Sequence, residues 1–289
     1  MLRTVALWRV ARGPGAARRM VSTAAPEVEV ARLSGADAGI VALGLSRPRA
    51  KNALSRSVVA QLHQALADIR ADSSARAVVL HSRVPGVFCA GADLKERATM
   101  APAEVDASLG SMRAVFTDLE RLPLPTIAAL DGAALGGGLE LALCCDLRVA
   151  GPGAVLGLPE TSLAIIPGAG GTQRLTRLIG PSRTKALVFT ARRLSAPAAH
   201  AMGVVTDAVA DAAPDAAYHR ALAWAREIIP NGPLAVRMAK RAIDHAGAVD
   251  PTTGLDIENL CYARLIPTQD RLEGLRAFKE KRPPVYTGE

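Results

Sequence analysis

The chain has 289 residues, of which 49% are hydrophobic and 3% aromatic, and its formal net charge is +8. This length and composition indicate a large, mainly aliphatic core in one extended domain or in two. The four cysteines form no C-x-x-C pair. Their spacing disfavours a zinc site and a disulfide framework, and it favours a reducing compartment.

The first residues are basic and free of acids. Residues 1–24 contain five arginines, the first acidic residue is Glu27, and without these arginines the net charge falls to +3. An amphipathic, arginine-rich segment without acids is typical of a mitochondrial transit peptide. We expect cleavage near Arg19–Ser22 and a mature protein in the mitochondrial matrix. The alternative is a disordered basic tail that touches nucleic acid.

From Val28 the chain alternates between strands and helices. In chain order, the hydrophobic patterns predict a strand at 39–45, a helix at 52–70, a strand at 77–81, a loop at 85–93 that enters a helix at Leu94, a helix at 103–120, a strand at 126–130, a short helix at 137–145 and a strand at 147–150. This order is typical of an α/β protein. The apolar stretch 127–145 contains Asp131, Glu140 and four glycines, so no membrane span is expected.

From about Asp215 onward the pattern changes. Helical spacing is found at 215–229, 233–246, 254–264 and 269–280, and no clear strand is present. We therefore predict a core at 28–214 and a helical region at 215–289 that packs on the core or on a neighbouring copy.

A glutamate in apolar surroundings is the first candidate for chemistry. Glu140 follows the glycine run Gly136–Gly138, and Leu143 and Cys144, at positions i+3 and i+4, are apolar. A carboxylate on a buried face is unfavourable unless it is paired, protonated or used in chemistry. The glycine run indicates either close packing of a helix on a sheet or a helix N-terminus whose amides face an anion or a polarised carbonyl. We favour a functional Glu140 over a structural one.

A second carboxylate, Glu160, follows Pro159. It is either the partner of Glu140 in general acid/base chemistry or an exposed acid in the first turn of a helix, where acids are favoured. The pattern alone leaves both interpretations open.

The segment Phe88–Lys95 is a tight turn into a helix, and its small residues allow the backbone to approach a ligand closely. Asp93 has the commoner interpretation of a helix N-cap. The Ala92 amide is a candidate oxyanion donor, together with an amide from the glycine run.

A third glycine loop, Pro167–Arg174, also leads into a helix. It lacks the G-K-[ST] ending of a P-loop, and neither glycine run has G-x-G-x-x-G spacing. No G-x-S-x-G elbow or H-E-x-x-H motif occurs, and the five histidines show no ligand spacing. No metal is therefore expected.

These motifs together resemble one family. In order, and across roughly residues 28–289, the segments Phe88–Lys95, Ala134–Glu140, Leu158–Glu160 and Ile166–Arg174 resemble the enoyl-CoA hydratase/isomerase (crotonase) superfamily. The resemblance implies an α/β spiral of ββα units with a C-terminal helical trimerisation region, assembled as a homotrimer or homohexamer. It also implies an acyl-CoA substrate, and no cofactor besides the coenzyme A of that substrate.

The resemblance assigns roles to single residues. It implies that the oxyanion donors are the amides of Ala92 and Gly137 and that the catalytic acids are Glu140 and Glu160. Isomerases of the family typically keep only the second acid, so both together favour hydration. Glu140 would then position and deprotonate water, and Glu160 would be the main proton donor, although these roles belong to a coupled pair. The CoA- and substrate-binding positions that it implies are Arg49, Ala90, Asp93, Leu94 and Lys95, with Phe278 and Lys281 reaching the CoA of a neighbouring subunit.

Within the superfamily, residues 84–97, 163–168 and 266–284 resemble the mitochondrial, RNA-binding methylglutaconyl-CoA hydratases. This implies hydration of 3-methylglutaconyl-CoA to 3-hydroxy-3-methylglutaryl-CoA in leucine degradation. A general short-chain enoyl-CoA hydratase of the domain-containing protein 2 type is the alternative. The RNA-binding helix of the branch is lysine-rich, whereas the matching stretch here has only Lys51 and Arg56 as cations. RNA binding should therefore be weak or absent.

Two further hypotheses follow from the same residues. One is an RNA-binding protein with weak hydratase activity, which the Glu140/Glu160 pair and the few cations disfavour. The other is an isomerase or hydrolase on the same fold, which predicts activity that survives Glu140→Ala.

Overall fold

The computed structural model describes residues 26–289, and the predicted transit peptide at 1–24 lies outside them. Two sheets form the body of the molecule. The six-stranded sheet has the order β1-β2-β3-β5-β7-β10. Its strands are β1 (Val28–Arg32), β2 (Ile40–Leu45), β3 (Ala77–Ser82), β5 (Thr126–Leu130), β7 (Leu147–Ala150) and β10 (Asp207–Ala208). The four-stranded sheet consists, in spatial order, of β4 (Val87–Cys89), β6 (Ala133–Leu135), β8 (Val155–Gly157) and β9 (Arg193–Ser195).

The chain passes repeatedly from the first sheet to the second. β3 leads into β4, β5 into β6 and β7 into β8, so that each turn of the chain adds one strand to each sheet. The strands pair in parallel except for β1 with β2 and β8 with β9. A helix follows most of these strand pairs, which confirms the predicted spiral of ββα units.

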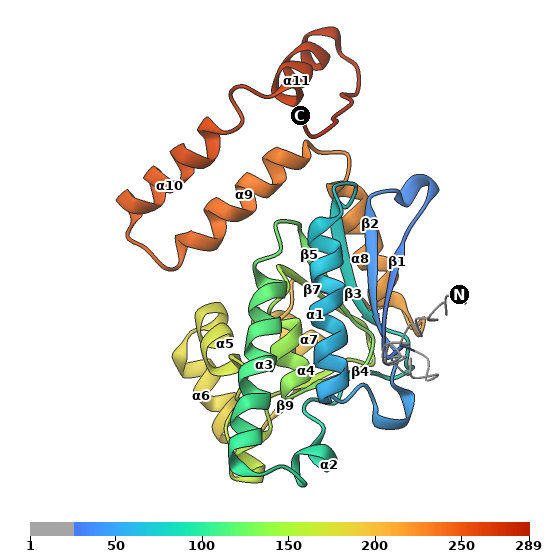
Figure 1. Cartoon of the computed structure of the whole chain (residues 1–289), viewed down its shortest axis with the longest axis vertical. Helices are drawn as coiled ribbons and strands as arrows, with labels where there is room; N and C mark the ends of the chain where they lie inside the picture. The colour runs from blue at the N-terminus through green and yellow to red at the C-terminus, as the bar shows by residue number, and fades with distance from the viewer. Residues whose placement is uncertain (1–25) are drawn as a thin grey trace, which may run out of the picture.

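Helices cover both faces of the six-stranded sheet, because its central strands are apolar on both sides. β2 and β5 are buried at every position. α1 (Arg56–Ala71) and α3 (Pro102–Glu120) pack side by side over one face, as Figure 1 shows. α8 (Ala216–Ile228) packs on the other face against β3, β5 and β7. The parallel strands are therefore shielded from water on both sides, as parallel sheets usually are.

The remaining helices of the body are short. They are α2 (Leu94–Arg97), α4 (Gly137–Ala142), α5 (Gly171–Ile179), α6 (Pro181–Phe189) and α7 (Ala196–Ala201). Within residues 26–289, no helix is long and apolar enough to cross a membrane.

Two sequence-based predictions need correction. The helix predicted at 52–70 begins at Arg56, because Lys51 and Asn52 adopt positive φ angles of 51° and 54° and the Ser55 side chain caps the helix by accepting from the Val58 amide. The loop predicted at 85–93 contains β4. Strands of three residues, such as β4, β6, β8 and β9, are too short to show a period of two in the sequence.

The C-terminal helices differ in where they pack. α8, the first helix of the predicted 215–289 region, belongs to the core, because Ala217, Ala221 and Ala225 are buried against the sheet. α9 (Pro233–Ala246), α10 (Pro251–Ala263) and α11 (Gln269–Glu280) extend away from the body (Figure 1). The part of the chain that leaves the body therefore begins at α9.

These outer helices and the segments that follow α10 and α11 expose large apolar side chains to solvent. They are Ile243, Leu255, Leu260, Tyr262, Ile266, Leu272, Leu275, Phe278 and Val285. An apolar surface of this extent is typical of a protein–protein interface.

The end of the chain is folded back onto α11. Two buried carboxylates hold it: Asp270 accepts from the amides of Thr287 and Gly288, and Glu273 accepts from Arg282 and from the Val285 amide. Bonds from Arg282 and Arg276 hold the pKa of Glu273 well below its usual range. The last turn of the chain is thus an ordered part of the outer region.

Candidate active site

Glu140 lies in α4, which begins after Gly136. Its side chain is buried, and its Oε1 accepts hydrogen bonds from the amides of Ala169 at 2.8 Å and Gly171 at 2.7 Å. The third glycine loop is therefore wrapped around this carboxylate. Burial raises the pKa of Glu140, and the two amides oppose that rise.

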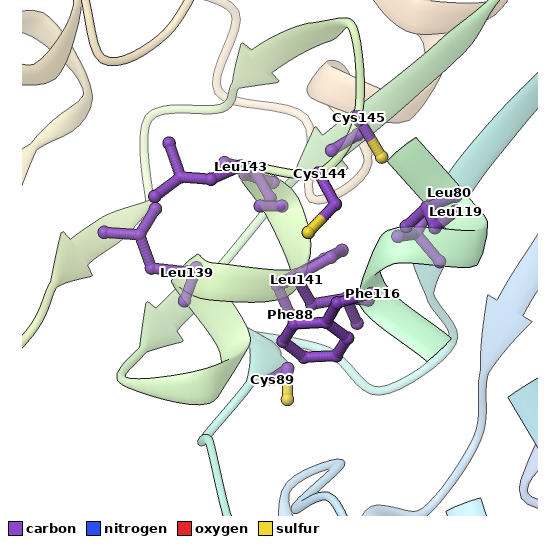
Figure 2. Packing of buried hydrophobic residues seen from close by; sticks show 14 of the residues in the cluster. Leu80, Phe88, Cys89, Phe116, Leu119, Leu139, Leu141, Leu143, Cys144 and Cys145 are labelled. Atoms are coloured by element: carbon purple, nitrogen blue, oxygen red, sulfur yellow. The ribbon is translucent and has the colours of Figure 1, made fainter. Parts of the chain in front are cut away.

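α4 gives Glu140 a rigid base. Its apolar residues are embedded in the main core, and Figure 2 shows Leu141 lying beside Phe88 and Phe116. Gly138 packs so closely on β4 that a Cβ there would lie 2.1 Å from the Cys89 carbonyl oxygen. The glycine run thus serves close packing at Gly138, as one of its two interpretations requires.

Glu160 is the first residue of a 3-10 turn, Glu160–Leu163, that follows β8. It is buried, so the exposed acid considered as the alternative is not what the structure shows. Its Oε2 atom is buried and finds no hydrogen-bond partner among the described residues. Burial raises the pKa of Glu160 to about 7, and the nearby charge of Glu140 adds to the rise.

Gly136 brings Glu160 to the start of α4. Its φ angle of 52° suits glycine, and a Cβ on it would lie 3.0 Å from Glu160 Oε1. The Gly136 carbonyl also accepts a hydrogen bond from the Glu140 amide. Gly136 therefore lies against Glu160 and precedes the helical turn that carries Glu140. The structure therefore brings the two predicted acids together.

The turns that contain Ala92 and Gly137 abut. A Cβ on Gly91 would lie 3.2 Å from the Gly137 nitrogen, and a Cβ on Gly137 would lie 3.4 Å from the Ala92 nitrogen. Gly137 is the first residue of α4, so its amide has no acceptor within the helix. Among the described residues, the Ala92 amide also donates no hydrogen bond to another backbone group. Two free amides therefore stand beside each other near the acids.

Two of the predicted CoA-binding positions, Ala90 and Arg49, lie on neighbouring turns. The Ala90 amide donates to the Lys51 carbonyl, next to the short turn that carries Arg49. Arg49, Ala90, Leu94 and Lys95 are all exposed, so they are accessible to a ligand.

Asp93 has a structural role as a helix cap and as the partner of an arginine. Its Oδ1 accepts from the amides of Lys95 and Glu96 and caps α2, while its Oδ2 pairs with Arg47 at 2.7 Å. These bonds lower the pKa of Asp93. Substrate binding by Asp93 stays a prediction, and it would use the same carboxylate that caps α2.

Phe278 and Lys281 lie on and just after α11, outside the body that holds α2 and α4 (Figure 1). Phe278 is 87% exposed. Contact with the CoA of a neighbouring subunit, as the resemblance implies, remains a prediction for both residues.

Sequence reasoning missed several parts of this site. The amides of Ala169 and Gly171 hold Glu140, and Asn52 is buried with its amide nitrogen donating to the Phe88 carbonyl. The glycines of the loop Pro167–Arg174 are a sequence signal for the amides of Ala169 and Gly171, because glycine allows the backbone to approach another group closely. Asn52 fell inside a stretch interpreted as helix and carried no signal.

The stretch from Lys51 that was compared with an RNA-binding helix continues into α1, and α1 itself has few free cations. Arg56 pairs with Glu96, and Arg70 donates to the carbonyls of Asp118 and Arg121. Within residues 26–289, no group of three His, Cys, Asp or Glu side chains is arranged to hold a metal ion.

Comparison with known proteins gives the same family as the motifs. The enoyl-CoA hydratase/isomerase family model matches residues 35–289. The human mitochondrial methylglutaconyl-CoA hydratase is 53% identical over 264 residues, which cover 91% of this chain and 78% of that protein. The human mitochondrial enoyl-CoA hydratase domain-containing protein 2 is 50% identical over 292 residues, covering 100% of both.

A solved structure agrees with these relatives. The crystal structure of an enoyl-CoA hydratase from Bacillus anthracis superimposes with a TM-score of 0.86 at 46% identity, covering 91% of this chain and all of that one. The names of these relatives agree with the prediction of a hydro-lyase. The chain belongs to the enoyl-CoA hydratase/isomerase family.

Proposed function

We propose that this protein adds water across the 2,3 double bond of an enoyl-CoA thioester, with 3-methylglutaconyl-CoA as its substrate in leucine degradation. One observation carries the proposal. Glu140 and Glu160 are buried together, yet only Glu140 has its carboxylate held by amides, whereas Glu160 Oε2 has no partner among the described residues. An unpartnered buried oxygen is unfavourable unless a ligand or water completes it.

The surroundings of the two acids suit them to different steps, because two amides stabilise the charged form of Glu140 whereas burial favours the protonated form of Glu160. In the hydration that we propose, a water molecule lies between the acids and the thioester oxygen accepts from the amides of Ala92 and Gly137. The water oxygen bonds to the β-carbon as the water proton passes to Glu140, and the Glu160 proton goes to the α-carbon. Negative charge that develops on the thioester oxygen is stabilised by the two amides. Exchange with solvent then restores a protonated Glu160 and an ionised Glu140.

This division of roles predicts the pH dependence of hydration. Glu160 has to be protonated, and its pKa is raised to about 7. We therefore expect kcat for hydration to fall about tenfold per pH unit above pH 7, because the protonated fraction falls at that rate. Stopped-flow measurement of crotonyl-CoA hydration between pH 5 and 9 checks this. A rate that rises through this range would contradict the assignment of Glu160 as the proton donor.

The substrate is tested by comparing two thioesters. We expect the protein without residues 1–24 to have a higher kcat/KM for 3-methylglutaconyl-CoA than for crotonyl-CoA. The methylglutaconyl assignment is supported by the name of a 53% identical human relative. A preference for crotonyl-CoA would favour a general enoyl-CoA hydratase, which the end-to-end match to domain-containing protein 2 supports. No turnover of either thioester would refute the hydratase proposal.

We also propose a homotrimer or a homohexamer located in the mitochondrial matrix. The exposed apolar side chains of α9–α11 support self-association, because burying them would remove a large apolar surface from water. The basic, acid-free residues 1–24 and the mitochondrial names of two relatives support the location. RNA binding gains no support from α1, since Arg56 pairs with Glu96 and the Arg70 guanidinium is bonded to backbone carbonyls.

A further inference from the structure

The loop that holds Glu140 is itself held from its other side by two arginines. Arg113 Nε on α3 donates to the Gly168 carbonyl oxygen at 2.7 Å. Arg174 Nη1 on α5 donates to the Ala169 carbonyl oxygen at 2.9 Å. Neither arginine belongs to the chemistry derived so far.

Arg113 and Glu140 bind opposite ends of one peptide group. The Gly168 carbonyl and the Ala169 amide belong to the same planar trans peptide, so they point in opposite directions. The carbonyl accepts from Arg113, and the amide donates to Glu140 Oε1 at 2.8 Å. A hydrogen bond at one end of a peptide polarises the other end, so the cation strengthens the bond to the carboxylate.

The next two peptides of the loop are held at their carbonyls as well. Arg174 holds the Ala169 carbonyl, and the Gly170 carbonyl accepts from the amides of Gln173 and Arg174 in the first turn of α5. The Gly171 amide, at the far end of the last of these peptides, donates to Glu140 at 2.7 Å. Each carbonyl from residue 168 to residue 170 is thus fixed.

Glycine is required at the two positions in the middle of this loop for different steric reasons. Gly170 has a φ angle of 107°, and a Cβ on it would lie 2.1 Å from Arg174 Nη1. A Cβ on Gly171 would lie 2.9 Å from Glu140 Cγ. Glu120 fixes Arg174 through two hydrogen bonds, at 3.1 Å and 2.8 Å. Arg174 on one side and Glu140 on the other therefore leave little space for a side chain at Gly170 and Gly171.

We propose that Arg113 and Arg174 are positioning residues for Glu140: by holding the Gly168 and Ala169 carbonyls, they fix the 168–171 loop so that the amides of Ala169 and Gly171 stay aimed at the Glu140 carboxylate. The inference deepens the proposed hydratase function and rests on it. Glu140 would then keep its water-facing oxygen in place during turnover, because its other oxygen cannot rotate away from two fixed donors.

The charges around Glu140 make this role measurable. Arg174 and Arg113 both oppose the rise in the Glu140 pKa that burial produces. The other titratable groups that face it are Glu160, whose own pKa is raised, and the buried Cys144 thiol, whose pKa burial raises well above its usual value. Loss of one arginine should therefore raise the pKa of Glu140 further.

The arginines can be changed without opening the core. Arg113 is exposed, and both arginines line a cavity of about 1450 Å³ between α9 and the body. Arg177 lines the same cavity from α5 and donates no hydrogen bond to the loop among the described residues. Arg177→Met is therefore a matched control that removes a cation from the same wall.

The test compares Arg113→Met, Arg113→Lys and Arg177→Met with the wild type. Crotonyl-CoA hydration is measured against pH, and the pKa of Glu140 is followed by NMR titration of 13C-labelled glutamate, with Glu140→Gln for assignment. We expect Arg113→Met to lower kcat by about 10- to 100-fold with a smaller change in KM, since slight misplacement of a reacting group has effects of this size. The acidic limb of the profile and the Glu140 resonance should move to higher pH. Arg113→Lys should recover most of the loss.

Several outcomes would overturn the inference. A folded Arg113→Met protein with the wild-type kcat and an unmoved Glu140 pKa would do so. Equal changes in kcat and in the Glu140 pKa in Arg177→Met would also overturn it, because the effect of Arg113 would then come from its net charge alone. If the wild type hydrates no thioester, the proposed function fails, and the NMR titration still decides whether Arg113 positions Glu140.

Discussion

Glu160→Gln is expected to lower kcat for enoyl-CoA hydration by about 10³-fold, within the range that a general acid contributes. Glutamine has nearly the shape of glutamic acid but cannot release a proton to the α-carbon. The buried position of Glu160 and its pKa of about 7 keep a large fraction of this acid protonated near neutral pH. Steady-state hydration of crotonyl-CoA, with KM measured alongside, checks the expectation.

Glu140→Gln separates hydration from the other reactions of the fold. Its remaining carbonyl oxygen can still accept from Ala169 and Gly171, so the loop should stay folded while the base is lost. We expect a loss of hydration similar to that of Glu160→Gln. Glu227→Gln, an exposed substitution on α8, serves as the control. Activity that survives in Glu140→Gln would favour the isomerase or hydrolase hypothesis.

Gly91→Ala should lower kcat by about 10²- to 10³-fold, the usual effect of losing one oxyanion donor. The new Cβ would lie 2.7 Å from the Leu135 carbonyl oxygen and 3.2 Å from the Gly137 nitrogen, so the two turns have to separate. The amides of Ala92 and Gly137 would then no longer converge on one oxygen. Steady-state kinetics with crotonyl-CoA measure the effect, and KM should change less than kcat.

Gly203→Ala controls for backbone strain. Gly203 also has a positive φ, of 80°, but a Cβ on it would meet nothing within 4 Å. It should therefore lose stability through the left-handed conformation, by about 1 to 2 kcal/mol, with little change in kcat. If Gly91→Ala were folded and as active as Gly203→Ala, the paired amides would not be the oxyanion site.

Much of this molecule follows from local patterns in the sequence. The apolar stretches at β2, β3, β5 and β7 are long enough to show that the strands are buried, and the helical spacing of the C-terminal region predicts all four helices there within a few residues. Glu140 stands out because its helical neighbours are apolar. The family resemblance then supplies its partner Glu160 and the two amide donors, which periodicity alone does not reveal.

Other features depend on contacts between distant parts of the chain. The three-residue strands β4, β6, β8 and β9 exist because each has a neighbour in the second sheet, not because of their own pattern. Asp93 is committed to a cap and to Arg47, which stands 46 residues earlier.

The surroundings of Glu140 show the same distinction most clearly. Its burial can be foreseen from residues one turn away, because a helix places them on the same face. The amides that bind it come from residues 29 and 31 positions later, and the arginines that hold carbonyls of the same loop come from two other helices. Local periodicity carries no information about such partners, so the sequence determined that Glu140 is buried, and only the tertiary structure decided what holds it.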